Sequence, residues 1–303
     1  MIDAGKRETQ EKHMAIPGLT IIGESINDSV PSTKALFDAG DLEGIVALAK
    51  SQVEGGAAYV DVNVGSRSAE LMAEVVRRVQ AAVDSPLSID TPDPVLARAG
   101  LANYSAERAG GRKPILNSIT VSREEMWELY SLQPFCPILL STEILVEGRP
   151  QPARTAEQTY EAARFLVEQA RKRCPGITNN DLIIDPGIVP IASDTEGNLK
   201  RLLGAMELIH NDPDLAGVHM SVGLSNFTVM LPPKRKDGSP VKSALESAFL
   251  TKAMPLGLDM IIGSVKRKYE LLPADHPAMQ CLEAVLRADG FEAIMAVRKF
   301  YAE

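Results

Sequence analysis

The sequence predicts a single-domain (β/α)8 barrel (TIM barrel) spanning residues 1–303, and three observations support this fold class. Eight short apolar runs recur along the chain, and helical patterns separate them. Alternation of strand and helix repeated in this way is typical of a (β/α)8 barrel. The competing arrangement, a doubly wound open sheet, is disfavoured because no Gly-x-Gly-x-x-Gly segment follows the first run.

The eight predicted strands are mostly Leu-rich or β-branched, and they lack strict alternation of apolar and polar residues. Such continuous apolar runs are expected for parallel strands that are buried on both faces. The runs occupy residues 19–23, 58–64, 87–90, 114–118, 137–141, 182–186, 219–225 and 259–264.

Amphipathic helices are predicted between these strands. In residues 68–83 and 155–172, apolar side chains recur at intervals of three or four and form one stripe. Thr155 with Gln158 resembles a capping box at the start of the second helix. A third helix is predicted over residues 241–254, before a Pro and a Gly that would end it.

Composition and charge exclude several classes of function. The net charge is −8 and no dense basic block is present, which argues against nucleic acid or an anionic membrane as the main partner. The three cysteines and four histidines are scattered, so neither a disulfide framework nor a metal site is predicted in this chain.

The N-terminal segment, residues 1–17, is expected to be flexible or extended. Its first residues are polar and lack the apolar core of a signal peptide. No stretch reaches the roughly 18–20 apolar residues that are needed to span a membrane. A cytoplasmic location is therefore expected.

Polar side chains gather at the ends of the predicted strands, where barrel active sites are built. These carboxylate, carboxamide and hydroxyl groups can accept from several N–H groups, and the carboxamides can also donate to a carbonyl. A pterin ring has such groups, whereas no Gly-rich phosphate cradle follows the last two strands. Taken singly, each residue can equally be a helix cap or a turn residue. The set comprises Glu24, Asn27, Asp61, Asn63, Asp90, Asn117, Ser118, Asp185, Ser225 and Asn226.

Six segments at these strand ends resemble one known family. In order, they read IIGESIN (21–27), DVNVG (61–65), LSIDT (87–91), ILNS (115–118), LIIDP (182–186) and GLSN (223–226). Together they resemble the pterin-binding methyltransferases, in particular the methyltetrahydrofolate:corrinoid protein methyltransferases. The folate domain of cobalamin-dependent methionine synthase is similar, and dihydropteroate synthase is more distantly so.

This resemblance implies an enzyme that moves a methyl group between N5 of tetrahydrofolate and the cobalt of a corrinoid (cobalamin). Tetrahydrofolate and methyltetrahydrofolate would be its substrates, and a separate corrinoid-binding protein its partner. The direction of transfer is left open. Asn226 and Asp90 are the implied catalytic residues, with Asn226 near N5. The implied folate-binding set is Asp61, Asn63, Asp90, Asn117, Asp185, Gly223, Ser225 and Asn226.

Two features depart from the family pattern, and two alternatives stay open. Ser25 stands where family members often have Arg, and residues 232–240 lengthen the loop after the seventh strand. The alternatives are another pterin-binding enzyme of the dihydropteroate synthase type and a non-catalytic folate-binding barrel. An apolar helix near the C-terminus is expected either to form a homodimer interface or to pack under the barrel. It carries Ile294, Val297, Phe300 and Tyr301.

Overall fold

The computed structural model describes residues 16–302 and confirms the predicted single-domain (β/α)8 barrel. Eight parallel strands close in the order β1-β10-β9-β8-β5-β4-β3-β2. Residues 1–15 of the predicted N-terminal segment lie outside the described residues, and Ile16 is buried. The barrel strands are β1 (Thr20–Asn27), β2 (Tyr59–Asn63), β3 (Leu87–Asp90), β4 (Ile115–Ile119), β5 (Cys136–Leu140), β8 (Ile183–Asp185), β9 (His219–Gly223) and β10 (Met260–Gly263).

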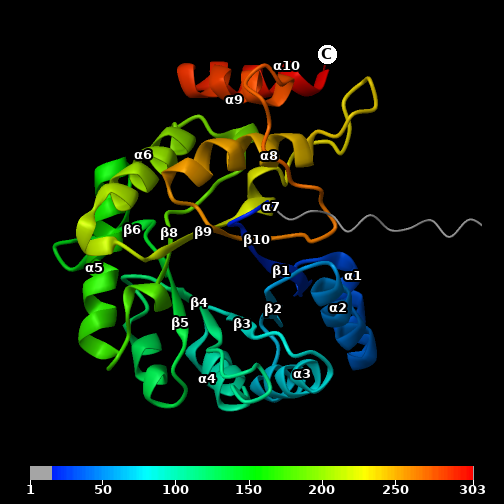
Figure 1. Cartoon of the computed structure of the whole chain (residues 1–303), viewed down its shortest axis with the longest axis vertical. Coiled ribbons are helices and arrows are strands. Elements are labelled where there is room, and N and C mark those ends of the chain that lie inside the picture. Colours follow the sequence, from blue (N-terminus) through cyan, green and yellow to red (C-terminus); the bar gives the residue numbers. More distant parts are fainter. Residues whose placement is uncertain (1–15, 303) are drawn as a thin grey trace, which may run out of the picture.

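Helices surround the barrel on its outer side (Figure 1). The three predicted helices correspond to α3, α5 and α8, and their bounds differ by one residue at each end. Side chains of Ser68 and Thr155 cap the first two of these helices. The α-helices are α1 (Pro31–Ala39), α2 (Leu42–Glu54), α3 (Ala69–Ala82), α4 (Pro94–Ala102), α5 (Ala156–Arg173), α6 (Asn198–Asn211), α7 (Leu224–Phe227), α8 (Lys242–Ala253), α9 (Pro277–Arg287) and α10 (Phe291–Ala302).

The regular alternation of strand and helix is interrupted in three places. A 3-10 helix, η1 (Glu124–Ser131), takes the place of an α-helix between β4 and β5. A hairpin of β6 (Glu143–Val146) and β7 (Arg149–Pro152) follows β5. Third, β9 passes directly into the short helix α7. The predicted strand 219–225 was therefore too long, because its pairing with β10 ends at Gly223. Four shorter 3-10 helices are η2 (Asn179–Asp181), η3 (Ile191–Ser193), η4 (Pro213–Leu215) and η5 (Met254–Leu256).

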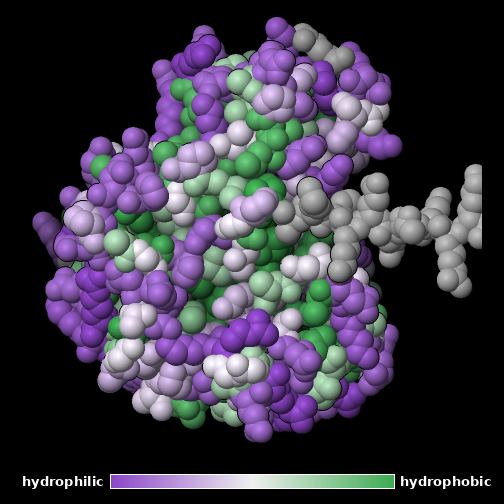
Figure 2. Space-filling view, in the orientation of Figure 1, coloured by the Kyte–Doolittle hydropathy of each residue, from purple (hydrophilic) through white to green (hydrophobic). Residues whose placement is uncertain are grey.

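The core has two layers, one inside the barrel and one between the strands and the helices. Buried Ile22, Ile115, Ile138, Ile183 and Met260 fill the interior. A larger cluster joins the outer faces of the strands to the helices. This double burial explains the continuous apolar runs in the sequence. In Figure 2 hydrophilic residues cover the outer helices, and hydrophobic residues show in the centre.

The C-terminal helix packs on its own chain. Val297 and Phe300 are buried in the core, and α10 lies against α9 at one end of the molecule (Figure 1). Arg235 in the 232–240 loop places its guanidinium 4.8 Å from the centre of the Phe300 ring. Its Nε also donates to the Phe300 carbonyl at 2.8 Å. Contacts with α10 therefore hold this loop, and the predicted homodimer stays a prediction.

Within residues 16–302, none of the helices combines the length and the apolar character that crossing a membrane requires.

Removal of the Phe249 ring should destabilise the protein. Phe249 on α8 is fully buried, and its ring centre lies 5.2 Å from that of Phe227 in α7. We expect Phe249→Ala to lower the free energy of unfolding by about 3–5 kcal/mol, measured by urea denaturation. The matched control is Phe291→Ala, because the Phe291 side chain is 68% exposed. A loss from Phe249→Ala no larger than that of the control would contradict the assigned packing.

Candidate functional site

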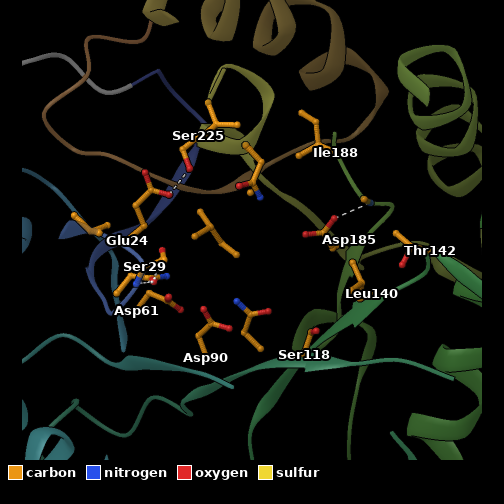
Figure 3. Close-up of a pocket in the computed structure, with 18 of the residues that line it drawn as sticks. Glu24, Ser29, Asp61, Asp90, Ser118, Leu140, Thr142, Asp185, Ile188 and Ser225 are labelled. Carbon is orange, nitrogen blue, oxygen red and sulfur yellow. Dashed lines mark hydrogen bonds between the residues drawn. The ribbon is translucent and has the colours of Figure 1, made fainter. Parts of the chain in front are cut away.

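A cavity of about 710 Å³ lies at the carboxyl ends of the barrel strands (Figure 3). Its volume is within the range of small-molecule sites. Seven of the eight residues in the implied folate-binding set line it: Asp61, Asp90, Asn117, Asp185, Gly223, Ser225 and Asn226. Asn63 does not line the cavity. Its Nδ2 instead donates to Asp90 Oδ2 at 2.8 Å, so Asn63 holds a lining carboxylate in place.

Asp61 and Asp90 form a close carboxylate pair on β2 and β3. Asp61 is 1% exposed, and its Oδ1 has no hydrogen-bond partner among the described residues. Burial, together with repulsion from Asp90, raises the pKa of Asp61 well above its usual range. Burial also raises the pKa of Asp90, and the hydrogen bond from Asn63 opposes that rise. Both carboxyl groups are therefore easier to protonate than exposed aspartates are.

Asp185 ends β8 on another side of the cavity (Figure 3). Its Oδ1 accepts from the Gly187 N–H at 2.8 Å. Burial raises the pKa of Asp185 to about 7, although this N–H and the charge of Arg201 both oppose the rise. Arg201 on α6 secures the loop through hydrogen bonds to the carbonyls of Pro186 and Gly187, each at 2.8 Å.

Asn226 enters the cavity from α7, directly after β9. Its approach depends on the absence of a side chain at Gly223, because a Cβ there would lie 2.8 Å from Asn226 Nδ2. On the same helix, Ser225 Oγ donates to Glu24 Oε2 at 2.8 Å. Two adjacent residues of α7 therefore shape the cavity. Asn226 contributes its carboxamide, and Ser225 holds the Glu24 carboxylate.

Three charged residues line the cavity but are not part of the implied folate-binding set. Glu24 was recognised as a strand-end residue, but its role was not assigned. Lys242 on α8 and Arg267 after β10 also line the cavity. Arg267 donates to the fully buried Glu246, which in turn accepts from Thr228. Lys242 lies on α8, away from every strand end, so the strand-end rule could not find it. Arg267 follows the end of β10 by four residues, and its place in the lining became clear only from the structure.

The cavity therefore combines groups of opposite character. Buried carboxyl groups and carboxamides lie around its floor. Two cationic side chains, those of Lys242 and Arg267, also line it. Groups of the first kind suit a flat heterocycle with several N–H donors and a carbonyl. The cations suit an anionic substituent. Within residues 16–302 no group of three or more His, Cys, Asp or Glu side chains is placed to hold a metal ion.

Asp185 should make stability depend on pH. Its folded pKa of about 7 lies above the usual value of 3.8, so the folded state binds the proton more tightly. Wild-type stability should therefore fall as pH rises between these two values, with no further change from this group above pH 7. Asp185→Asn keeps an acceptor for Gly187 and removes the titration. The difference in unfolding free energy between Asp185→Asn and wild type should grow in favour of the variant as pH rises over this interval, to at most about 4 kcal/mol. Urea denaturation between pH 4 and pH 8 measures it, and an advantage that does not vary with pH would contradict the assignment.

Comparison with known proteins agrees with this geometry. The chain is 28% identical over 257 residues to a methylcorrinoid:tetrahydrofolate methyltransferase of Eubacterium limosum, covering 80% of this chain and 84% of the relative. Among solved structures, a dihydropteroate synthase from Xanthomonas albilineans has a TM-score of 0.52 at 20% identity, covering 89% of this chain and 92% of that chain. One from Thermus thermophilus has a TM-score of 0.53 at 19% identity, covering 82% and 88%. These structural likenesses show the fold.

The family assignment rests on a match to most of the chain. Residues 26–263 match the model of the family described as pterin binding enzyme. This range runs from the end of β1 to the last residue of β10, and it includes nearly every lining residue of the cavity. The chain therefore belongs to the pterin binding enzyme family.

Proposed function

We propose that this protein transfers a methyl group between a corrinoid on a partner protein and N5 of tetrahydrofolate. The supporting observation is the cavity itself, in which Asp90, Asn117 and Asp185 line one space together with Asn226. The methyltransferase from Eubacterium limosum is named for methylcorrinoid and tetrahydrofolate. That name gives tetrahydrofolate as the acceptor in the relative, and we adopt the same direction here.

The pterin would be oriented by the carboxylates and carboxamides of the floor. Asp90, Asn117 and Asp185 are proposed to bind the N–H groups and carbonyl of its pyrimidine side. Asp61, buried beside Asp90, would favour uptake of a proton by that pair, and Asn63 would hold Asp90 in position. Orientation of this kind lowers the barrier because the reacting nitrogen is already aimed at the incoming methyl group.

Asn226 is the proposed residue at N5. Nitrogen N5 gains positive character as the new N–C bond forms, and a carboxamide oxygen can stabilise it by accepting the N–H. Asn226 reaches the cavity because Gly223 leaves space for it. Ser225 and Gly223 are therefore proposed as residues that place Asn226 and its surroundings, without chemistry of their own.

The corrinoid would approach the open mouth of the cavity on its own carrier protein. The methylated cobalt supplies an electrophilic methyl group when the corrinoid is bound. Close to the mouth, the segment after α7 exposes Val229 by 57% and Met230 by 64%, and Val229 lines the cavity. These apolar side chains are the part of the rim that we propose the partner contacts, because desolvation of exposed apolar surface favours association.

Asn226→Ala should slow methyl transfer far more than it weakens folate binding. Loss of an interaction made mainly in the transition state lowers kcat, and we expect a fall of about 100-fold. Cobalt absorbance, followed anaerobically in a mixture of methylcobalamin and tetrahydrofolate, measures the transfer. Calorimetry measures the affinity for tetrahydrofolate. The matched control is Asn211→Ala, because Asn211 is an exposed residue at the end of α6.

Other outcomes distinguish the alternatives. Loss of affinity without loss of kcat in Asn226→Ala would overturn the assigned role of this residue. Folate binding with no transfer from methylcobalamin or from a methylated corrinoid protein would favour a non-catalytic folate-binding barrel. Condensation of 4-aminobenzoate with a pterin diphosphate would favour the dihydropteroate synthase type.

A further inference from the structure

We propose that Glu24 is the base that accepts the N5 proton of tetrahydrofolate during methyl transfer. The inference rests on the proposed function and adds to it the group that the reaction needs and Asn226 cannot supply. A carboxamide neither binds nor releases a proton at neutral pH. A secondary amine that gains a methyl group must lose its proton to a nearby base.

An irregularity in β1 directs Glu24 into the cavity. The register between β1 and β2 shifts between Gly23 and Ile26, so the strand departs from regular pairing at this point. Gln52 Oε1 accepts the Ser25 N–H at 2.7 Å, and Thr33 Oγ1 donates to the Ser25 carbonyl at 2.8 Å. Both supporting side chains are buried, and the backbone next to Glu24 is therefore held in place.

Ser225 connects Glu24 to the helix that carries Asn226. Ser225 Oγ donates to Glu24 Oε2 at 2.8 Å, and the two side chains meet at one side of the cavity (Figure 3). Glu24 Oε1 has no hydrogen-bond partner among the described residues. Glu24, Ser225 and Asn226 all line the cavity, and Asn226 follows Ser225 directly in the chain, so we place N5 between the Asn226 carboxamide and this free oxygen.

The surroundings of Glu24 favour uptake of a proton. The charged and titratable groups facing it are Asp61 on β2, with Arg267 and Tyr269 after β10. Burial raises the pKa of Glu24, whereas the Ser225 hydrogen bond and the Arg267 charge oppose that rise. A carboxylate with a raised pKa binds a proton more readily than an exposed glutamate does, and it can release that proton again.

The other carboxyl groups of the cavity are less suited to this task. Asp90 and Asp185 are proposed to bind the pyrimidine side of the pterin, so they are already engaged away from N5. Asp61 is 1% exposed and repelled by Asp90. Among the carboxyl groups that line the cavity within residues 16–302, only that of Glu24 accepts a hydrogen bond from α7.

The proposed step balances in atoms and charge. The N5 lone pair forms the new N–C bond as the cobalt–carbon bond breaks, and the electron pair of that bond stays with the cobalt. The N5–H bond, whose hydrogen the Asn226 oxygen accepts while the N–C bond forms, then breaks. Its electrons remain on N5, and the proton passes to Glu24. The products are N5-methyltetrahydrofolate and a protonated Glu24 carboxyl, which returns its proton to solvent after the product leaves.

Glu24→Gln tests the proposal by removing only the ability to take up a proton. We expect kcat in anaerobic methyl transfer from methylcobalamin to fall about 100-fold, with unchanged tetrahydrofolate affinity. The acidic limb of the wild-type pH–rate profile, which reports protonation of the base, should disappear. Glu143→Gln is the matched control, because Glu143 lies in the β6–β7 hairpin and bonds Ser122 outside the cavity lining.

A second variant moves the pKa while keeping the carboxylate. Ser225→Ala removes the hydrogen bond that favours the charged form of Glu24, so the acidic limb should shift to higher pH. A merely structural role for Ser225 would lower the rate equally at every pH.

Product binding gives a readout without turnover. At neutral pH, wild-type protein should take up a proton on binding N5-methyltetrahydrofolate, measured by calorimetry in two buffers of different ionisation heat, and Glu24→Gln should not.

Three results would overturn the inference. One is a Glu24→Gln variant that keeps the wild-type rate and acidic limb, with the wild-type protein active. The second is equal proton uptake by wild type and Glu24→Gln on product binding. In both cases the proposed function survives and only the base is wrong. The third is a wild-type protein that neither binds tetrahydrofolate nor transfers methyl, and this result overturns the proposed function together with the inference.

Discussion

Closure of eight parallel strands places their carboxyl ends around one cavity, and this convergence dominates the structure. Four carboxyl groups, those of Glu24, Asp61, Asp90 and Asp185, are brought to the same space. Burial of like charges is unfavourable, and it raises the pKa of each group. Such an arrangement persists only because the hydrophobic core elsewhere supplies the stability to hold it.

Residues behind the cavity determine how each lining group is oriented. Asn63 holds Asp90, the Gly187 N–H holds Asp185, and Ser225 holds Glu24. These supporting hydrogen bonds come from β2, from the loop after β8 and from α7, so no single helix or strand holds the whole site. Precise function of such a site depends on support of this kind, because a loosely held group loses its alignment with the substrate.

The pterin binding family shares its fold with enzymes of different chemistry, so the barrel alone cannot define the reaction. The dihydropteroate synthases cited above resemble this chain in fold at about one-fifth identity. The proposed reaction therefore rests on the residues of the cavity. The carboxamide of Asn226 and the proposed base Glu24 both depend on the short helix after β9.

The sequence by itself determined the fold class and most of the lining, because strand burial and strand-end polarity are local patterns. All eight apolar runs became barrel strands, and most of the polar residues singled out at their ends line the cavity. Tertiary structure alone decided the rest. The support of Asp90 by Asn63, the hydrogen bond from Ser225 to Glu24, and the contact of Arg267 with Glu246 all join residues distant in sequence. No local pattern records such contacts, since they exist only once the barrel has closed.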